Sequence, residues 1–359
     1  MTEREYITAL YSFVPFGPAR INLLISYFGS AKKAWGASSR QLLEIGLKEK
    51  VVHDFLTFRE SFNSKEYFFR LKRLSVDFVT EKDHDYPENL ADLEDAPSVL
   101  YIKGSLKKSD TNAVAIVGSR KMTSYGREVA GNFASQLASL GVTIVSGLAR
   151  GIDTVAHSTA LESGGRTIAV LGCGLDKMYP PENISLAKKI IESGAVVSEY
   201  PLGYPALPTN FASRNRIISG LSKATVVIEG LEKSGTLLTA SAAAEQGRSV
   251  FAVPGQITSP MSAAPLFLLQ NGAKMATKAS DILEELNLQL NVDRERVEQV
   301  LPADALEAQL TEIIANEPLH LDEIARISSL SVANISAKLT VMELKGMVKN
   351  LGGGVYKKA

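Results

Sequence analysis

The amino-acid sequence predicts an α/β protein built on a Rossmann-like, doubly wound and mostly parallel sheet. Three observations lead to this prediction. The chain has 359 residues, more than one typical domain holds. Its middle alternates short runs of Val and Ile with helical patterns, which is typical of parallel strands buried on both faces. Its two ends lack this alternation, so we expect an N-terminal helical domain and a C-terminal winged helix-turn-helix domain beside the sheet.

The composition excludes several classes of protein. Lys+Arg and Asp+Glu number 39 each, so the formal net charge is zero; this excludes a histone-like polycation but allows a local basic groove. Cys173 is the one cysteine, which excludes a disulfide framework and a cysteine-based zinc site. The sequence has no apolar run of about 18 residues. We therefore expect a cytoplasmic protein with no membrane partner.

Residues 1–65 form the predicted helical domain, in which apolar residues recur at helical spacing. Gly17-Pro18 and Gly29 separate its first helices. A glycine turn between short helices can present backbone N–H groups to a phosphate, as helix-hairpin-helix and SAM-like modules do. The turn at 13–17 is apolar and contains no basic residue, which favours a plain helical accessory domain.

Residues 66–288 form the predicted Rossmann-like domain. The predicted strands are 113–117, 142–146, 167–171, 196–199, 225–229 and 249–253. The predicted helices include 127–140, 153–162, 184–193 and 237–246. Because ligands of such sheets bind at the carboxyl ends of the strands, we expect function in the loops that follow the strands.

The C-terminal part begins with an acidic linker at 289–301. Residues 302–359 then read as a winged helix-turn-helix domain. Its predicted elements are helices 306–315, 322–327 and 332–344, followed by strands 347–351 and 355–357 around three glycines.

Three loops of the central domain combine small residues with polar or basic side chains, a composition that suits a phosphate at a helix N-terminus. Arg120 and Arg150 each add a forked guanidinium. Because several such loops share one sheet edge, they indicate an extended ligand with many phosphates. The candidate residues are Gly118, Ser119 and Arg120; Ser146, Gly147, Arg150 and Gly151; and Ser234, Gly235 and Thr236.

A fourth candidate stretch has Phe211 ahead of Arg214, Asn215 and Arg216, with Ser213 as a possible N-cap of a helix. Arginines along a phosphate backbone, beside an aromatic ring that stacks on a base, are typical of sequence-tolerant single-strand binding. The alternative is a surface helix with Phe211 in the core.

The sequence offers no convincing catalytic, metal or cofactor motif. Asp153 and His157 share a helical face, but an N-cap role for Asp153 and a packed or solvated histidine explain the pair without catalysis. The four histidines are scattered, and no metal-ligand spacing occurs. The first loop also lacks the glycine spacing of the dinucleotide fingerprint and of the P-loop. We therefore expect a binding protein rather than an enzyme, without cofactor or metal.

Taken together, these loops resemble the DNA-processing protein A family, also called DprA or Smf. The matching motifs occur in the family's order over about residues 76–278. They are VGSR at 117–120, SGLARGID at 146–153, VLGCGLD at 170–176, RNRIISGLS at 214–222, SGT at 234–236 and VPG at 253–255.

The resemblance implies a non-enzymatic protein that binds single-stranded DNA and loads the RecA recombinase during natural transformation and homologous recombination. It implies DNA-binding roles for Arg150, Phe211, Arg214 and the loop at 118–120. It also implies a homodimer formed through the Rossmann-like domain.

Two places depart from the family pattern. Pro208 stands where some members have a lysine, so one phosphate contact differs here. Ala264 and Leu266 stand where glycine and asparagine are usual, in a region that the family uses for self-association.

Two other functions remain open at this point. A nucleotide N-glycosidase of the lysine-decarboxylase-like group shares the sheet, but its paired-glycine loop is replaced here by Lys233-Ser234-Gly235-Thr236. A transcription regulator would use the winged domain. The predicted third helix of that domain carries Lys338 as its only basic residue. This is less positive charge than a helix that recognises bases in the major groove usually carries.

Overall fold

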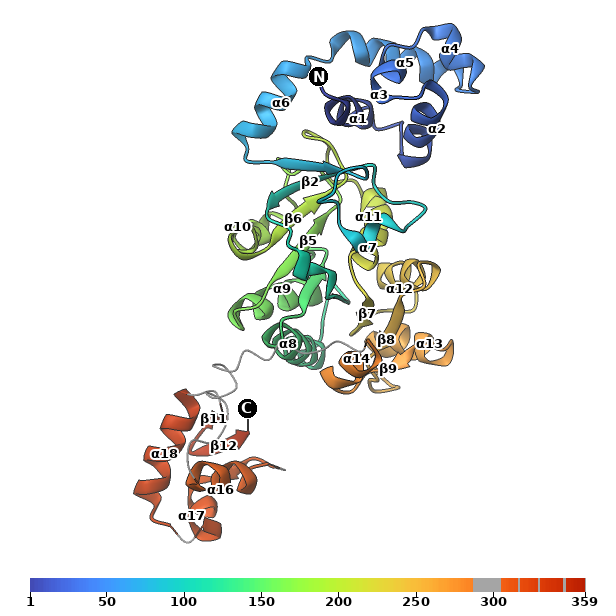
Figure 1. Ribbon diagram of the computed structural model, residues 1–359. Helices are drawn as coiled ribbons and strands as arrows, with labels where there is room; N and C mark the ends of the chain where they lie inside the picture. The colour runs from blue at the N-terminus through green and yellow to red at the C-terminus, as the bar shows by residue number, and fades with distance from the viewer. Residues whose placement is uncertain (287–304, 316, 329, 345–346, 359) are drawn as a thin grey trace. The chain divides into compact units, whose positions relative to one another are not determined.

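The computed structural model describes residues 1–286, 305–315, 317–328, 330–344 and 347–358 (Figure 1). The chain divides into two compact units, Met1–Gln289 and Leu290–Ala359. The predicted acidic linker at 289–301 lies outside the described residues.

The first unit is organised around a nine-stranded sheet of order β1-β2-β6-β5-β4-β3-β7-β8-β9. From β6 to β9 in this order all neighbours pair in parallel, while β2 pairs antiparallel with both β1 and β6. The strands are β1 Asp77–Thr80, β2 Val99–Gly104, β3 Ala113–Val117, β4 Thr143–Ser146, β5 Thr167–Leu171, β6 Ala195–Ser198, β7 Ala224–Val227, β8 Ser249–Ala252 and β9 Lys274–Met275. The predicted doubly wound, mostly parallel fold is confirmed.

Helices cover both faces of this sheet (Figure 1). They are α7 Glu88–Ala91, α8 Ser124–Ser139, α9 Ile152–Glu162, α10 Ile184–Ser193, α11 Pro208–Gly220, α12 Gly235–Glu245, α13 Ala263–Gln270 and α14 Ala279–Glu285, with short 3-10 turns η1 Lys108–Thr111, η2 Pro181–Asn183 and η3 Pro260–Ser262. Alternate residues of each strand face opposite ways. Val114 and Ile116 of β3 therefore pack with α8 and α9, while Ala113 and Ala115 pack with α7 and α11.

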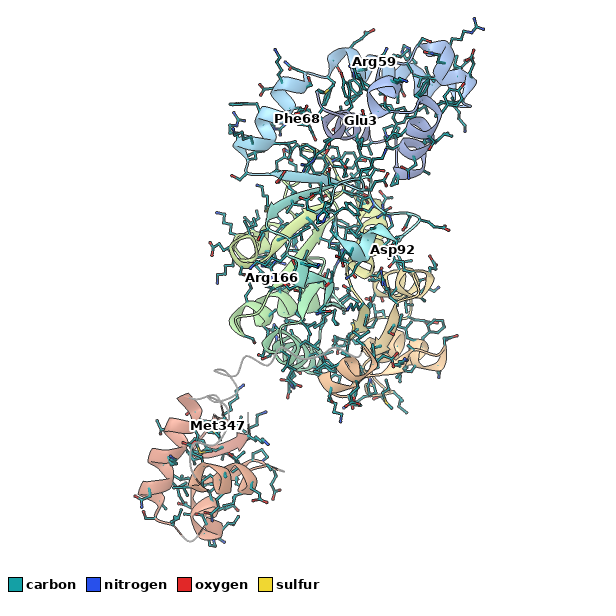
Figure 2. The ribbon with its side chains drawn as sticks, in the orientation of Figure 1. Glu3, Arg59, Phe68, Asp92, Arg166 and Met347 are labelled. Carbon is teal, nitrogen blue, oxygen red and sulfur yellow. The ribbon has the colours of Figure 1, made fainter. Side chains whose placement is uncertain are left out.

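Six N-terminal helices form a cluster that shares a core with the sheet. They are α1 Glu3–Tyr11, α2 Pro18–Phe28, α3 Ala31–Trp35, α4 Ser39–Glu44, α5 Glu49–Ser61 and α6 Ser64–Arg73. Tyr67 of α6 donates a hydrogen bond to the hydroxyl of Tyr101 in β2 at 2.9 Å. Phe68, labelled on α6 in Figure 2, has its ring centroid 5.8 Å from that of Phe78 in β1. Phe16, in the apolar turn before α2, is 1% exposed, so this turn contributes its side chains to the core.

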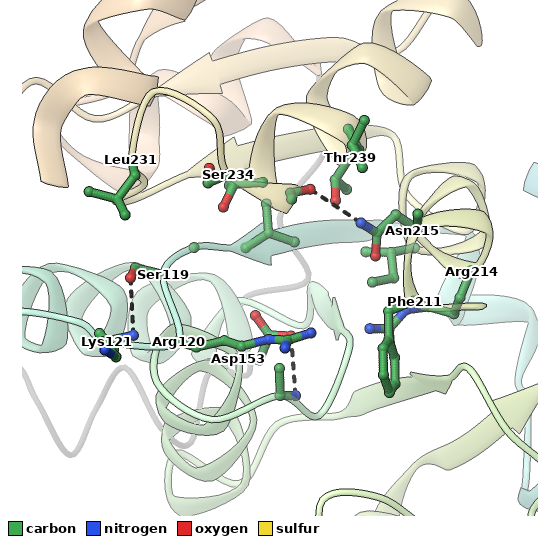
Figure 3. A pocket seen from close by; sticks show the side chains of 18 of the residues that line it. Ser119, Arg120, Lys121, Asp153, Phe211, Arg214, Asn215, Leu231, Ser234 and Thr239 are labelled. Atoms are coloured by element: carbon green, nitrogen blue, oxygen red, sulfur yellow. Dashed lines mark hydrogen bonds between the residues drawn. The ribbon is translucent and has the colours of Figure 1, made fainter. Parts of the chain in front are cut away.

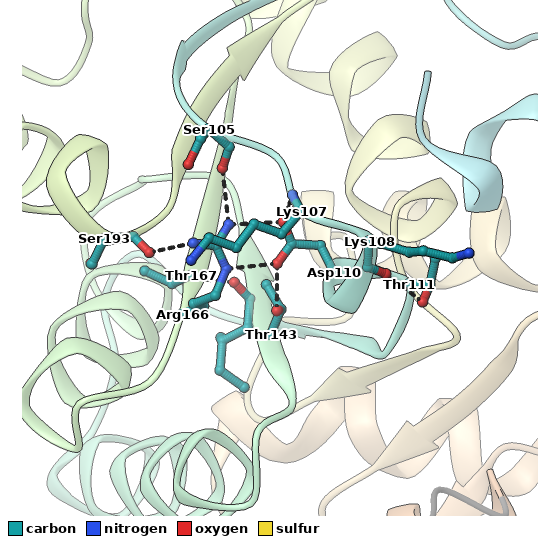
Figure 4. Close-up of polar contacts among 10 residues, drawn as sticks. Ser105, Lys107, Lys108, Asp110, Thr111, Thr143, Arg166, Thr167 and Ser193 are labelled. Atoms are coloured by element: carbon teal, nitrogen blue, oxygen red, sulfur yellow. Dashed lines mark hydrogen bonds and ion pairs between the residues drawn. The ribbon is translucent and has the colours of Figure 1, made fainter. Parts of the chain in front are cut away.

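One arginine network links the amino ends of the parallel strands (Figure 4). Arg166 donates from Nε and from a terminal nitrogen to the two carboxylate oxygens of Asp110, both at 2.9 Å. Its other bonds reach the backbone carbonyls of Ser105 and Ser193, and Thr143 donates to Asp110 at 2.8 Å. The Arg166 and Asp110 charges therefore pair with each other and hold the starts of these strands together.

The second unit is a winged helix domain, as predicted. Its elements are α16 Ala305–Ile313, β10 Leu319–His320, α17 Leu321–Ser328, α18 Val332–Leu344, β11 Val348–Gly352 and β12 Val355–Lys358. The glycines at 352, 353 and 354 all have positive φ and turn β11 back along β12. Lys338 pairs with the buried carboxylate of Glu307 at 3.0 Å. Among the described residues, no helix combines the length and the apolar surface needed to span a bilayer.

Candidate nucleic-acid interface

A pocket of about 490 Å³ opens at the carboxyl ends of β3 and β7 (Figure 3). The chain passes from β3 to β4, β5 and β6 on one side of β3, and then returns to β7 on its other side. This reversal of strand order is where open α/β sheets bind their ligands. The pocket is lined by Gly118, Ser119, Arg120, Phe211, Arg214, Asn215, Ser234, Gly235 and Thr236 of the predicted set.

The first loop, after β3, does not offer the free helix N-terminus that its sequence predicts. Glu229, which is 3% exposed, accepts a hydrogen bond from the backbone N–H of Thr123 at 2.9 Å and another from the Thr123 hydroxyl. A carboxylate of the protein itself therefore occupies the positive end of α8. What the loop presents to the pocket is the exposed side chains of Arg120 and Lys121.

The second loop, after β4, turns its backbone N–H groups inward. Asp153 accepts from the N–H of Gly147 at 3.0 Å and of Ala149 at 3.3 Å, and His157 Nε2 accepts from Leu148 at 3.3 Å. The prediction of Asp153 as N-cap is wrong, because α9 begins at Ile152 and the carboxylate bonds to the loop instead. The loop is thus a rigid support for the exposed Arg150 rather than a backbone cup for phosphate.

His157 is a packed, uncharged histidine. Its Nδ1 lies 2.7 Å from the hydroxyl of Thr167, which itself donates to the carbonyl of Ile144 at 2.6 Å. The Thr167 hydroxyl therefore accepts the Nδ1 proton, and Nε2 stays free to accept from Leu148. Burial, together with the nearby Arg214 charge, lowers the pKa of His157 to about 3.

Arg214 lines the base of the pocket and is itself buried. The residue is 3% exposed, and one terminal nitrogen donates to the carbonyls of Gly147 and Val170. Burial lowers its pKa to about 10. A Cβ at Gly147 would lie 2.5 Å from the guanidinium, so Gly147 is required by this packing. One terminal nitrogen of Arg214 therefore holds carbonyls at the strand ends, while the phosphate contact predicted for this residue stays a prediction.

Aromatic and cationic side chains meet at the rim of the pocket. The Arg120 guanidinium lies over the Phe211 ring, 5.4 Å from its centroid, and the Tyr179 ring lies 5.7 Å from the same ring. A smaller pocket continues from this point and is lined by Arg120, Arg150, Tyr179 and Phe211. Phe211 is half-buried, so it is neither a core residue nor a fully exposed one.

The N-terminus of α12 forms the opposite wall. Ser234 is its N-cap, and the buried Ser234 hydroxyl has no hydrogen-bond partner among the described residues. Asn215 reaches across from α11 and donates to the carbonyl of Gly235 at 3.3 Å. This helix end, unlike that of α8, has no carboxylate on it in the described hydrogen bonds.

Three predicted residues, Ser146, Gly151 and Arg216, line neither pocket, and Gly147 and Arg150 line only the smaller one. Arg216 pairs with Glu199 at 2.6 Å and with Asp95 at 3.3 Å on the other side of α11. Ser146 is fully buried and donates to the carbonyl of Ile116 at 2.7 Å. Ser213 is not an N-cap either, because α11 already begins at Pro208.

Two residues of the rim were missed by the sequence analysis. Lys121 lines the main pocket and Tyr179 the smaller one. Lys121 directly follows Arg120, which was a usable signal. Nothing local marks Tyr179, because it reaches the rim through the fold of the loop after β5.

Comparison with known proteins places the chain among DNA-processing proteins. The family model described as DNA recombination-mediator protein A matches residues 77–287, and that of the DprA winged helix domain matches residues 295–354. The protein Smf of Synechocystis is 33% identical over 99% of this chain and 99% of its own length. The protein Smf of Escherichia coli is 39% identical over 87% of this chain and 85% of its own.

Solved structures agree with this grouping. The X-ray structure of DNA processing protein A from Streptococcus pneumoniae superposes with a TM-score of 0.69 at 34% identity, covering 78% of this chain and 97% of that one. The DNA processing protein A of Helicobacter pylori, solved to study its single-stranded DNA binding mode, gives a TM-score of 0.53 at 29% identity over 59% of this chain and 95% of that one.

Proposed function

Because this chain belongs to the DNA recombination-mediator protein A family, we propose that it binds single-stranded DNA along the carboxyl edge of its parallel sheet. The observation that carries the proposal is the Arg120–Phe211 contact, with Arg150 and Tyr179 beside it. Cations beside a partly accessible aromatic ring suit a strand whose phosphates and unstacked bases are both accessible.

The proposed strand follows the two joined pockets from α12 to Tyr179. Its phosphates meet Arg120, Lys121 and Arg150 and the N-terminal N–H groups of α12. A base stacks on the half-buried Phe211 ring. A duplex keeps its bases stacked inside, so it binds more weakly, and contacts to phosphates and one ring face make base composition nearly irrelevant.

We extend the proposal to the finer function that the family resemblance implies, namely a homodimer that loads the RecA recombinase onto the bound strand by binding alone, without catalysis. Exposed apolar side chains on α12, α13 and β9 support a protein interface there, since such residues mark interaction sites when they gather. They are Leu238, Phe267 and Met275, each about half exposed. RecA filament assembly on single strands already coated with a single-strand-binding protein tests the loading step.

The binding test compares a single-stranded oligonucleotide with its duplex by fluorescence anisotropy. We expect Phe211→Ala to lower single-strand affinity by about 1–3 kcal/mol. Tyr125→Ala is the matched control, because Tyr125 is an exposed aromatic residue of α8 that lines neither pocket. Melting curves of both variants separate lost binding from lost stability.

Two outcomes contradict the proposal. Equal affinity for the duplex and the single strand is one. The other is competition by a mononucleotide as strong as that of the oligonucleotide, with release of free base from nucleoside monophosphates. The latter result identifies a nucleotide N-glycosidase instead.

A further inference from the structure

A separate pocket of about 330 Å³ lies at the same sheet edge, on the other side of α11. Glu199 and Tyr200, which follow β6 directly, form one wall, and Tyr11 and Phe16 of the N-terminal cluster form another. The first turns of α11 separate the two sites: Phe211 lines the main pocket, and Ser213, two residues on, lines this one. A strand that follows the carboxyl edge past Phe211 therefore reaches this second pocket next.

The walls of the second pocket are aromatic. Tyr200 and Tyr204 are stacked, with ring centroids 5.0 Å apart and planes within 9° of parallel. Both residues are partly exposed. Two parallel rings with accessible surface make a platform on which a third planar ring continues the stack.

The charges at this pocket disfavour a phosphate. Arg216 is the cation here, and it is shared between the carboxylates of Glu199 and Asp95 at 2.6 and 3.3 Å. Two acidic groups against one basic group leave no positive charge for an anion. Glu199 accepts a hydrogen bond from the Tyr11 hydroxyl at 3.1 Å and another from Arg216, and both reach its Oε2 atom. Its Oε1 accepts no hydrogen bond from any residue the structure describes, so an acceptor remains for an N–H donor.

We propose that this pocket binds a nucleobase of the same single strand, stacked on the Tyr200–Tyr204 pair, while the phosphates stay at the arginines of the main groove. A neutral planar ring with N–H donors fits aromatic walls and a spare carboxylate oxygen, whereas a phosphate fits neither. The inference rests on the proposed single-strand function and deepens it, because it gives the groove a second base site that uses the N-terminal helices.

The test is a length series of single-stranded oligonucleotides measured against wild type, Tyr204→Ala and Phe211→Ala. Tyr204→Ala should bind the shortest effective oligonucleotides as wild type does, and lose about 5- to 150-fold in affinity for longer ones, the range expected for one stacked base. Tyr204→Phe should keep the wild-type affinity because it keeps the ring. Tyr27→Ala is the control, since Tyr27 is an exposed tyrosine of the N-terminal cluster that does not line the pocket.

A second variant distinguishes loss of the base site from loss of folding. Ser213 is exposed and lines the pocket, so Ser213→Trp fills the space without disturbing a buried residue. It should reproduce the length-dependent loss and abolish quenching of a fluorescent adenine analogue at the position that reaches the pocket. Wild-type affinity of Ser213→Trp and Tyr204→Ala at every length overturns the second base site. Failure of wild type to bind any single strand overturns the proposed function itself.

Discussion

Arg150 and Arg214 are both predicted to bind DNA, yet their surroundings differ completely. Arg150 is 58% exposed and pairs with Glu182, itself 56% exposed, a surface pair that contributes little to stability. Arg214 is 3% exposed and holds the ends of β4 and β5 through carbonyls. Residue type alone does not reveal this difference, because both are arginines near the carboxyl edge of one sheet.

Alanine substitutions of the two arginines should therefore have different effects, one on DNA binding and the other on stability. Arg150→Ala should weaken single-strand binding by about 1.5–3 kcal/mol, the value of a charged hydrogen bond, and leave the melting temperature unchanged. Arg214→Ala should lower the free energy of unfolding by about 2–5 kcal/mol, because two buried carbonyls lose their donor and the buried Asp153 carboxylate loses a nearby positive charge. Anisotropy and urea unfolding on both variants check the contrast. A stable Arg214→Ala protein with normal loop structure would contradict the structural assignment.

His157 should make stability depend on pH. Its pKa is about 3 in the folded protein against 6.5 for an ordinary histidine, so the unfolded chain takes up the proton first as pH falls. The stability that neutral His157 contributes is complete above pH 6.5 and declines toward pH 3, at up to about 1.4 kcal/mol per pH unit.

Urea unfolding of wild type and His157→Gln across this range provides the measurement. The variant should have a smaller slope just below pH 6.5. Burial raises the pKa of Asp153 in the folded protein above its unfolded value. Between those two pKa values stability increases as the pH falls. Wild type and His157→Gln share this contribution. Identical slopes in the two proteins would mean that His157 is accessible to protons when folded.

At the scale of elements, the strands with unbroken apolar runs were the easiest to predict. The predicted spans 113–117 and 167–171 coincide with β3 and β5, and the other four predicted strands differ by one or two residues at their ends. β1, β2 and β9 were not predicted. β9 has only two residues, and nothing in the sequence of β2 states that it runs antiparallel to β6, a strand about 90 residues later.

The contacts between loops could not be predicted from the sequence either. That Glu229 occupies the α8 N-terminus, or that Arg216 turns to Glu199, depends on which strands become neighbours. Phe211 and Arg120 could be selected by residue type, because cationic and aromatic side chains at one sheet edge are informative before their contacts are known.

One glycine joins the first two loops. Gly151 has φ +79°, and a Cβ there would lie 2.2 Å from the carbonyl oxygen of Ser119. Gly141 has nearly the same φ, +80°, with no atom within 4 Å. Gly151 therefore has two reasons to be glycine, its backbone conformation (φ +79°, ψ −128°) and the close carbonyl, whereas Gly141 has only its positive φ.

Gly141→Ala should cost about 1–2 kcal/mol of stability, the price of a left-handed conformation with a side chain. Gly151→Ala should cost more and should also weaken single-strand binding, because the loop that carries Arg120 must move. Unfolding and anisotropy measurements on the two variants test this. Equal stability losses, with unchanged binding in both, would show that the loop contact is dispensable.

At the scale of the whole molecule, the distribution of charge fixes the response to salt. The net charge is zero, so attraction to DNA depends on the local groove. Four convergent arginines would give a slope of log affinity against log salt near −3. The structure leaves three exposed cations at the joined pockets, Arg120, Lys121 and Arg150.

We therefore expect a slope of about −2, so that a fourfold increase in salt weakens binding about 20-fold. A salt series on single-stranded oligonucleotides measures it, and Arg150→Ala should reduce the slope by about one third. A slope near zero would mean that phosphates are not the main contact.

The antiparallel β2 strand also has a consequence for how the chain is made. Its partner β6 follows about 90 residues later, which at about 5–20 residues per second is an interval of roughly 5–20 s on the ribosome. During that time the apolar strand has only β1 at its side. The N-terminal helices emerge first and share a core with Val99 and Tyr101. We expect them to shelter β2 during synthesis, so that nascent chains lacking these helices would aggregate before the sheet closes.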